Sequence, residues 1–243
     1  MSIRHIFVYP NTRIFGFAIF FACIVGIGCE QSKDFASARI SMVENQIIAR
    51  GVTDPHVISA MKKVPRERFV PENLRHYAYS DGPVPIGYGQ TISQPYIVAL
   101  MTQELRVNPN DKVLEVGTGS GYQAAVLAEI GCQVYTIEII EPLAKSAEER
   151  LKELGYTNVK VKVGDGYLGW QEYAPFDRII VTCAPKEVPQ PLIDQLADGG
   201  IMVIPVGPEG FQYLYRIKKQ GGIVETERIT AVSFVPLTGP HAK

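Results

Sequence analysis

The stretch Lys112–Ala125, which reads KVLEVGTGSGYQAA, constrains the fold of this chain most strongly. A short apolar run precedes three glycines on alternate positions, and small, helix-favouring residues follow them. This pattern predicts a buried strand, a tight turn and the start of a helix. Glycines suit such a turn because a side chain would oppose its backbone angles, and because a ligand can then approach the backbone closely. The free N–H groups at the helix start can bind ligand oxygens.

The glycine spacing narrows the class of ligand. A dinucleotide-binding fingerprint, GxGxxG, needs its third glycine where Tyr122 stands, so the chain does not match it. GxGxG after an acidic strand end is similar to the pattern with which class I methyltransferases bind S-adenosylmethionine. We therefore predict binding of a nucleotide-like ligand at Gly117, Gly119 and Gly121.

Composition limits the kinds of function that this chain can have. Its 243 residues suffice for one domain with a sizeable core, and 46% hydrophobic with 20% charged residues is ordinary for a globular protein. A net charge of -1 does not indicate a basic surface, so no nucleic-acid partner is expected. The cysteines show no CxxC spacing, so no metal site is expected. Cys132 and Cys183 are expected to be buried and not nucleophilic.

The first 29 residues differ from everything that follows. Arg4 and Arg13 precede an uncharged apolar run, and a small residue precedes Cys29. This is the pattern of a signal peptide, and the run is short for a membrane span. The sequence around Cys29 also resembles the lipidation site of bacterial lipoproteins. The expected organisation is a signal-peptide-like or anchor segment at residues 1–29, a tether at 30–41 and the main domain at 42–243.

Between this segment and the glycine stretch we expect helices and a long loop. Asp54 and Pro55 are expected to cap a helix over residues 57–64. Residues 66–89 contain so many turn-forming residues that an ordered, functional loop is expected there. Four apolar residues fall on one face of an earlier predicted helix that Gly51 ends: Ile40, Val43, Ile47 and Ile48.

After the glycine stretch, strands and helices alternate. Alternation of this kind predicts a doubly wound α/β fold with a mostly parallel sheet covered on both faces. The expected strands are residues 133–137, 159–163, 176–181 and 200–206, and the expected helices are residues 141–154 and 188–196. The tail differs, because residues 213–218 and 229–235 flank Gly221 and Gly222 as in an antiparallel hairpin.

Three acids follow or end consecutive predicted strands: Glu115, Glu138 and Asp165. Ligands of open α/β sheets bind beyond the carboxyl ends of the strands. Glu138 follows Gly117 by roughly 20 residues, the separation at which an acid meets ribose hydroxyls. Asp165, between two glycines, is placed to reach the adenine edge. Glu115 either joins the ligand site or only buttresses the loop by accepting backbone N–H bonds.

Ser93, in the segment QTISQP, has two alternative roles. It could cap the helix whose first turn contains Pro95, or it could hydrogen-bond a substrate carboxylate. No histidine or acid adjoins it in sequence, which argues against a triad nucleophile. The carboxylate-binding role is therefore our hypothesis.

Taken together, these segments resemble the protein-L-isoaspartate O-methyltransferase family from about Ile40 to Gly239. The glycine motif is shared by many methyltransferases, whereas GQTISQP and FVPLTG are specific to this family. The other matching segments are MVENQIIARGV, VPRERFVP, VLEVGTGSGYQAAVLA, the acid Glu138, GDG and DRIIVTCAP.

The resemblance implies a Rossmann-like class I methyltransferase. Its members move a methyl group from S-adenosylmethionine to the free carboxylate of L-isoaspartyl residues in damaged proteins and peptides. By the resemblance, Ser93 is the active-site hydroxyl, Thr91 lies beside it, and Val235 contacts the substrate peptide. The predicted cofactor-binding residues, including those from the glycine and acid patterns, are Glu115, Gly117, Gly119, Gly121, Glu138, Asp165 and Gly166.

Location and function have alternatives. The family resemblance predicts a cytoplasmic monomer, whereas residues 1–29 predict export to the cell envelope, with a lipid anchor at Cys29 and no other membrane association. Another class I methyltransferase, acting on small molecules or RNA, is a second function, against which the near-neutral charge and QTISQP argue. An exported binding protein on the same fold is a third, against which the intact GxGxG, Glu138 and Ser93 argue.

Overall fold

The computed structural model describes residues 34–241. The predicted signal or anchor segment, residues 1–29, and the start of the predicted tether lie outside the described residues, whereas residues 37–42 are helical. Within the part of the chain that the structure describes, no helix is both long and apolar enough to cross a membrane.

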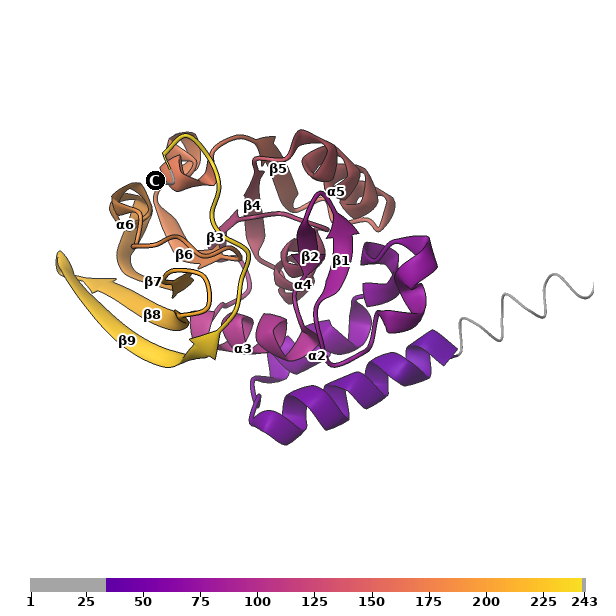
Figure 1. Cartoon of the computed structure of the whole chain (residues 1–243). Helices are drawn as coiled ribbons and strands as arrows, with labels where there is room; N and C mark the ends of the chain where they lie inside the picture. The colour runs from indigo at the N-terminus through magenta and orange to yellow at the C-terminus, as the bar shows by residue number, and fades with distance from the viewer. Residues whose placement is uncertain (1–33, 242–243) are drawn as a thin grey trace, which may run out of the picture. The chain divides into compact units, whose positions relative to one another are not determined.

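A seven-stranded sheet forms the centre of the domain (Figure 1). Five neighbouring strands are parallel, and β8 and β9 extend the sheet as an antiparallel pair at one edge. The predicted fold class and C-terminal hairpin are therefore confirmed. In spatial order the strands are β5 (Val159–Val163), β4 (Gln133–Glu138), β3 (Lys112–Val116), β6 (Phe176–Val181), β7 (Leu196–Val206), β8 (Gln212–Gln220) and β9 (Ile223–Val232).

Helices cover both faces of this sheet because β3 is apolar on both. Val113 belongs to a core cluster with residues of α2, α3 and α4, whereas Leu114 belongs to a second cluster that includes Leu192 of α6. Successive residues of a strand point to opposite faces, so a doubly covered strand needs a near-continuous apolar run. The helices are α2 (Pro55–Lys63), α3 (Pro95–Leu105), α4 (Tyr122–Ile130), α5 (Glu141–Glu153) and α6 (Gln190–Gln195).

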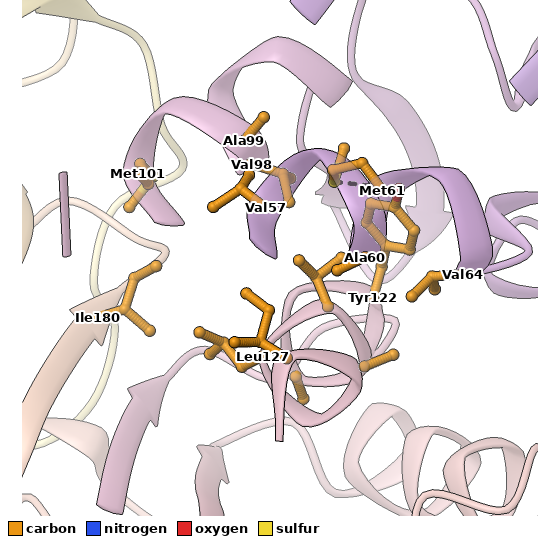
Figure 2. Packing of buried hydrophobic residues seen from close by; sticks show 14 of the residues in the cluster. Val57, Ala60, Met61, Val64, Val98, Ala99, Met101, Tyr122, Leu127 and Ile180 are labelled. Carbon is orange, nitrogen blue, oxygen red and sulfur yellow. Dashed lines mark hydrogen bonds between the residues drawn. The ribbon is translucent and has the colours of Figure 1, made fainter. Parts of the chain in front are cut away.

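Figure 2 shows the packing of α2, α3 and α4 against one another. Met61 of α2 and Tyr122 of α4 are buried side by side, and the Tyr122 hydroxyl donates to the Met61 sulfur at 3.7 Å. A fully buried side chain of this size stabilises the fold by about 1.5–3 kcal/mol. The start of α2 is fixed as predicted, because the Asp54 carboxylate accepts the N–H groups of His56 and Val57 at 2.8 and 3.2 Å.

The region before α3 differs from two predictions. Val43 and Ile47 are buried, but Ile40 and Ile48 are exposed. The turn over residues 43–47 is π-helical and changes the face that the following Ile48 occupies, whereas Ile40 lies before this turn. The loop expected over residues 66–89 instead forms short helices and a hairpin. The elements here are η1 (Val43–Ile47), η2 (Ile48–Arg50), η3 (Arg66–Phe69), η4 (Glu72–Tyr77), β1 (Val84–Gly87) and β2 (Gln90–Ile92).

In the second half of the chain, two element boundaries differ from expectation, and two short helices were not expected. The helix expected over residues 188–196 is shorter, because Leu196 pairs with Phe176 and already begins β7. Strand β9 begins at Ile223, directly after the turn at Gly221 and Gly222, and not at Ile229. Two short helices precede β6: η5 (Gly166–Leu168) and η6 (Gln171–Tyr173).

Candidate active site

A pocket of about 850 Å³, partly open to solvent, lies beyond the carboxyl ends of β3, β4 and β6. Ligands of open α/β sheets bind in this position. The hairpin β1–β2 and residues 235–238 supply further walls. Predicted site residues that line the pocket are Thr91, Ser93, Gly117, Gly119, Glu138, Gly166 and Val235, whereas Glu115, Gly121 and Asp165 are not among its lining residues.

The three glycines between β3 and α4 make different contacts. A methyl group on Gly117 would stand 2.4 Å from Oγ1 of Thr182, which donates to the Gly117 carbonyl at 2.6 Å. Gly121 is the N-cap of α4 and faces α5. At Gly119 the nearest atom to such a methyl group would be Cδ1 of Ile86, at 3.5 Å. Gly119 is therefore the glycine whose missing side chain leaves room for a ligand in the pocket.

Glu138 joins two loops at the floor of the pocket. One carboxylate oxygen accepts the N–H of Gly119 at 2.8 Å, and the other accepts the N–H of Ile140 at 2.9 Å. A carboxylate has about four acceptor positions, so two remain for the hydroxyl groups of a ligand. With the apolar neighbours Ile139 and Leu237 on the pocket wall, this acceptor fits an adenosyl ligand.

Glu115 does not buttress the glycine loop. It is fully buried, and neither carboxylate oxygen has a hydrogen-bond partner among the described residues. Thr136, opposite it on β4, bonds to the hydroxyl of Thr118 at 2.6 Å, and its interaction with Glu115 offsets only part of the effect of burial. Burial raises the pKa of Glu115 to about 8, so the group is protonated at neutral pH. The expected buttress contacts are made by Glu138.

Asp165 is covered by the C-terminal segment. One oxygen accepts the N–H of Tyr167 at 3.0 Å, and the other lies 2.7 Å from Nδ1 of His241. Gly239 packs so closely that a methyl group there would stand 2.9 Å from Oδ1. His241, which no sequence pattern singles out, thus contacts the acid predicted to bind adenine. The adenine contact itself stays a prediction, and the adjacent Gly166 lines the pocket.

Ser93 is not the cap of α3. The cap position is Gln94, and no side chain bonds to the first turn of the helix. The Ser93 carbonyl accepts a hydrogen bond, but no hydrogen bond joins its hydroxyl to another residue of the described chain. The capping alternative is therefore wrong, and the hydroxyl stands in the pocket wall without a protein partner.

Arg66 holds the backbone at Ser93 and was missed in the sequence. Its fully buried guanidinium donates to the carbonyls of Ala78 at 2.6 Å and Ser93 at 2.7 Å, and lies 4.7 Å from the ring of Tyr122. Nη1 has no partner among the described residues, and burial lowers the pKa of the side chain. The motif VPRERFVP contains this residue, but nothing in it shows which of its charges is buried.

The segment that contains FVPLTG is held in place by two contacts. The buried amide of Gln212 accepts the N–H of Phe234 at 2.6 Å and donates to its carbonyl at 3.1 Å. Ala184 donates to the Val235 carbonyl at 2.8 Å and accepts from the N–H of Leu237 at 2.9 Å. These contacts place residues 235–238 along the pocket wall.

Both cysteines that the structure describes, Cys132 and Cys183, are buried. Burial raises the pKa of Cys132 to about 12 and also raises that of Cys183, which lines the pocket. The burial and the raised pKa values agree with the expectation that Cys132 and Cys183 are buried and not nucleophilic. Within residues 34–241, no group of three or more His, Cys, Asp or Glu residues is arranged to hold a metal ion.

Comparisons with known proteins agree on one family. The profile of the family described as protein-L-isoaspartate(D-aspartate) O-methyltransferase (PCMT) matches residues 38–242. A protein-L-isoaspartate O-methyltransferase of Picosynechococcus sp. is 57% identical over 201 residues, which are 83% of this chain and 90% of that one.

Solved structures give the same result. A protein-L-isoaspartate O-methyltransferase superposes with a TM-score of 0.75 at 28% identity, over 84% of this chain and 66% of that one. A beta-aspartate methyltransferase (PCMT) from Plasmodium falciparum, in complex with S-adenosyl-L-homocysteine, has a TM-score of 0.73 at 30% identity, over 82% and 98%. The chain therefore belongs to the protein-L-isoaspartate(D-aspartate) O-methyltransferase family, a family of protein-repair enzymes that use S-adenosyl-L-methionine as methyl donor.

Proposed function

We propose that this chain methylates the free carboxylate of L-isoaspartyl residues in damaged proteins and peptides, and that the Ser93 hydroxyl hydrogen-bonds the reacting carboxylate. One observation carries the role of Ser93: its hydroxyl has no bond to another described residue and lines the same pocket as Glu138 and the glycine loop. The family match does not favour the two alternatives, which are another class I methyltransferase and a binding protein on the same fold.

Methyl transfer to a carboxylate requires that the two substrates are positioned correctly, and it does not require a general base. A carboxylate is already ionised at neutral pH. One of its oxygens forms a bond to the methyl carbon while the carbon–sulfur bond breaks, and the electron pair of that bond stays on sulfur. Ser93 and Thr91 orient the carboxylate, and the walls formed by β1–β2 and residues 235–238 exclude water.

The methyl donor lies against the opposite wall in this proposal. Glu138 accepts hydrogen bonds from the ribose hydroxyls, and Asp165 with Gly166 meets the adenine edge. The loop of Gly117, Gly119 and Gly121 surrounds the methionine part, with Glu115 buried beneath it. Val235 contacts the backbone of the substrate peptide.

Oligomeric state and location complete the proposal. The chain acts as a monomer on isoaspartyl-containing proteins. For location, the family resemblance places the enzyme in the cytoplasm, whereas residues 1–29 predict export and attachment at Cys29. Fractionation of cells that express the natural chain and a Cys29→Ala variant separates these two outcomes.

Transfer of labelled methyl from S-adenosyl-L-methionine to an isoaspartyl peptide, with the aspartyl isomer as control, tests the function. Labelling of the isoaspartyl peptide alone is expected, and equal labelling of both or of neither would contradict it. Ser93→Ala should lower kcat/KM about tenfold to hundredfold, because a hydrogen bond to a charged group is lost. Ser80→Ala, an exposed serine, is the matched control. Stability should change by less than about 0.5 kcal/mol in either variant, because Ser93 is not a cap.

A further inference from the structure

Tyr88 occupies a turn position that normally excludes a bulky side chain. Tyr88 and Gly89 connect β1 to β2, with φ angles of +53° and +70°. Two-residue hairpin turns with positive φ at both positions favour Asn, Asp or Gly. A bulky residue at positive φ is an outlier. The chain thus places a tyrosine where a smaller residue would hold the hairpin with less strain.

No contact within the fold compensates for this strain. The Tyr88 residue is 63% exposed. Among the described residues, its side chain has no hydrogen-bond, aromatic or cationic partner, and only its carbonyl accepts a bond, from the amide of Gln90 at 3.4 Å. Backbone strain that no contact within the fold compensates is typical of functional positions.

The turn places Tyr88 next to the pocket: Tyr88 is not itself a lining residue, but it stands two positions before Gln90, which is one. The strand that follows lines the pocket with Gln90, Thr91 and Ile92, and Ser93 comes next. On the preceding strand, Ile86 faces Gly119. A polypeptide substrate extends well beyond the one residue whose carboxylate meets Ser93. Side chains on either side of that residue must therefore lie along the rim.

We propose that Tyr88 is a specificity-determining residue that packs against the side chain next to the isoaspartyl residue of the substrate polypeptide and favours an apolar or aromatic neighbour there. The inference rests on the proposed function, because it takes Ser93 as the place where the carboxylate binds. Tyrosine suits this role because its large, rigid ring gives contact area at a low cost in conformational entropy. Aromatic pairs gain further from ring geometry.

Four isoaspartyl hexapeptides test this inference, with Phe or Ser placed directly before or directly after the isoaspartyl residue. For the natural chain, KM for at least one Phe peptide should be about fivefold to tenfold lower than for its Ser counterpart. In Tyr88→Asn the ratio of KM for the Ser peptide to KM for the Phe peptide should fall to about one. The melting temperature of Tyr88→Asn should stay equal or rise, because Asn is favoured in this turn, so a loss of the ratio is not a loss of folding.

Phe211→Asn is the matched control. Phe211 is 78% exposed, and neither β7 nor β8, the strands on either side of it, supplies a lining residue of the pocket, so its replacement should keep the natural ratio of KM values. Equal KM values for Phe and Ser peptides in the natural chain, or a ratio that survives in Tyr88→Asn, would overturn the inference. Absence of methylation of every isoaspartyl peptide by the natural chain would instead overturn the proposed function.

Discussion

The two halves of the pocket are held together in different ways. The cofactor half, which we define as residues 117–121 and 138–140, is held by bonds between the ends of neighbouring strands, such as those from Gly119 and Ile140 to Glu138. The substrate half, defined as residues 90–93 and 235–238, depends on buried side chains from elsewhere in the chain: Arg66 for Ser93 and Gln212 for Phe234. Both halves therefore depend on a side chain, Glu138 in the first and Arg66 in the second, but the side chains that hold the substrate half come from distant segments, and Arg66 is fully buried. Loss of Arg66 should therefore disrupt the substrate half more strongly than loss of Glu138 disrupts the cofactor half.

Arg66→Met should have the largest effect and should disrupt the substrate half. It leaves the carbonyls of Ala78 and Ser93 without their donor, which should lower the free energy of unfolding by about 2–5 kcal/mol. Turnover per folded molecule should fall, because Ser93 loses its anchor. Affinity for S-adenosyl-L-homocysteine should stay near that of the natural chain. Urea unfolding and calorimetry measure the two effects.

Arg68→Met is the control for this variant. The Arg68 side chain is 49% exposed and, among the described residues, pairs only with an exposed glutamate, so its loss should cost less than about 0.5 kcal/mol. If Arg66→Met costs no more than Arg68→Met, or if cofactor affinity falls as far as turnover does, the two halves are not held separately.

The same difference explains which parts could be predicted from sequence. Strand, glycine turn and following acid lie in one continuous pattern, so the order of elements around Gly119 and Glu138 was correctly expected. The contact from Arg66 to Ser93 spans 27 residues and follows no periodic pattern. Residues 66–89, which form short helices and strand β1, are expected from the sequence to be a loop, because proline and glycine content like theirs is typical of irregular turns.

Glu138→Ala tests the cofactor half and should have a smaller effect on stability. It removes the acceptor for the N–H groups of Gly119 and Ile140 and for the proposed ribose hydroxyls. Affinity for S-adenosyl-L-homocysteine should fall by about 1–3 kcal/mol. Glu138→Gln keeps one acceptor oxygen and should lose less. Unchanged affinity in both variants would show that Glu138 only joins the two loops.

Glu115→Gln tests a residue whose place in a buried strand follows from the sequence, whereas the lack of hydrogen-bond partners around it does not. A strand pattern shows that Glu115 is buried, but not that both its oxygens lack partners among the described residues. Burial raises its pKa from 4.5 to about 8 in the folded state. Between these values the folded chain keeps a proton that the unfolded chain releases, so stability contributed by this group falls as pH rises through that window.

Glutamine cannot ionise, so Glu115→Gln should remove this loss. Relative to the natural chain, the variant should gain more stability at pH 8.5 than at pH 5 by up to about 4 kcal/mol, because about three pH units of the window lie between these pH values, and urea unfolding at both measures the gain. Glu44→Gln, at an exposed glutamate, should show no such difference. An equal difference in stability at both pH values would mean that Glu115 has a partner that keeps it ionised in the folded chain. A buried charge would then lie in β3, directly before the glycine loop of the cofactor half, and the surrounding residues would have to compensate for it.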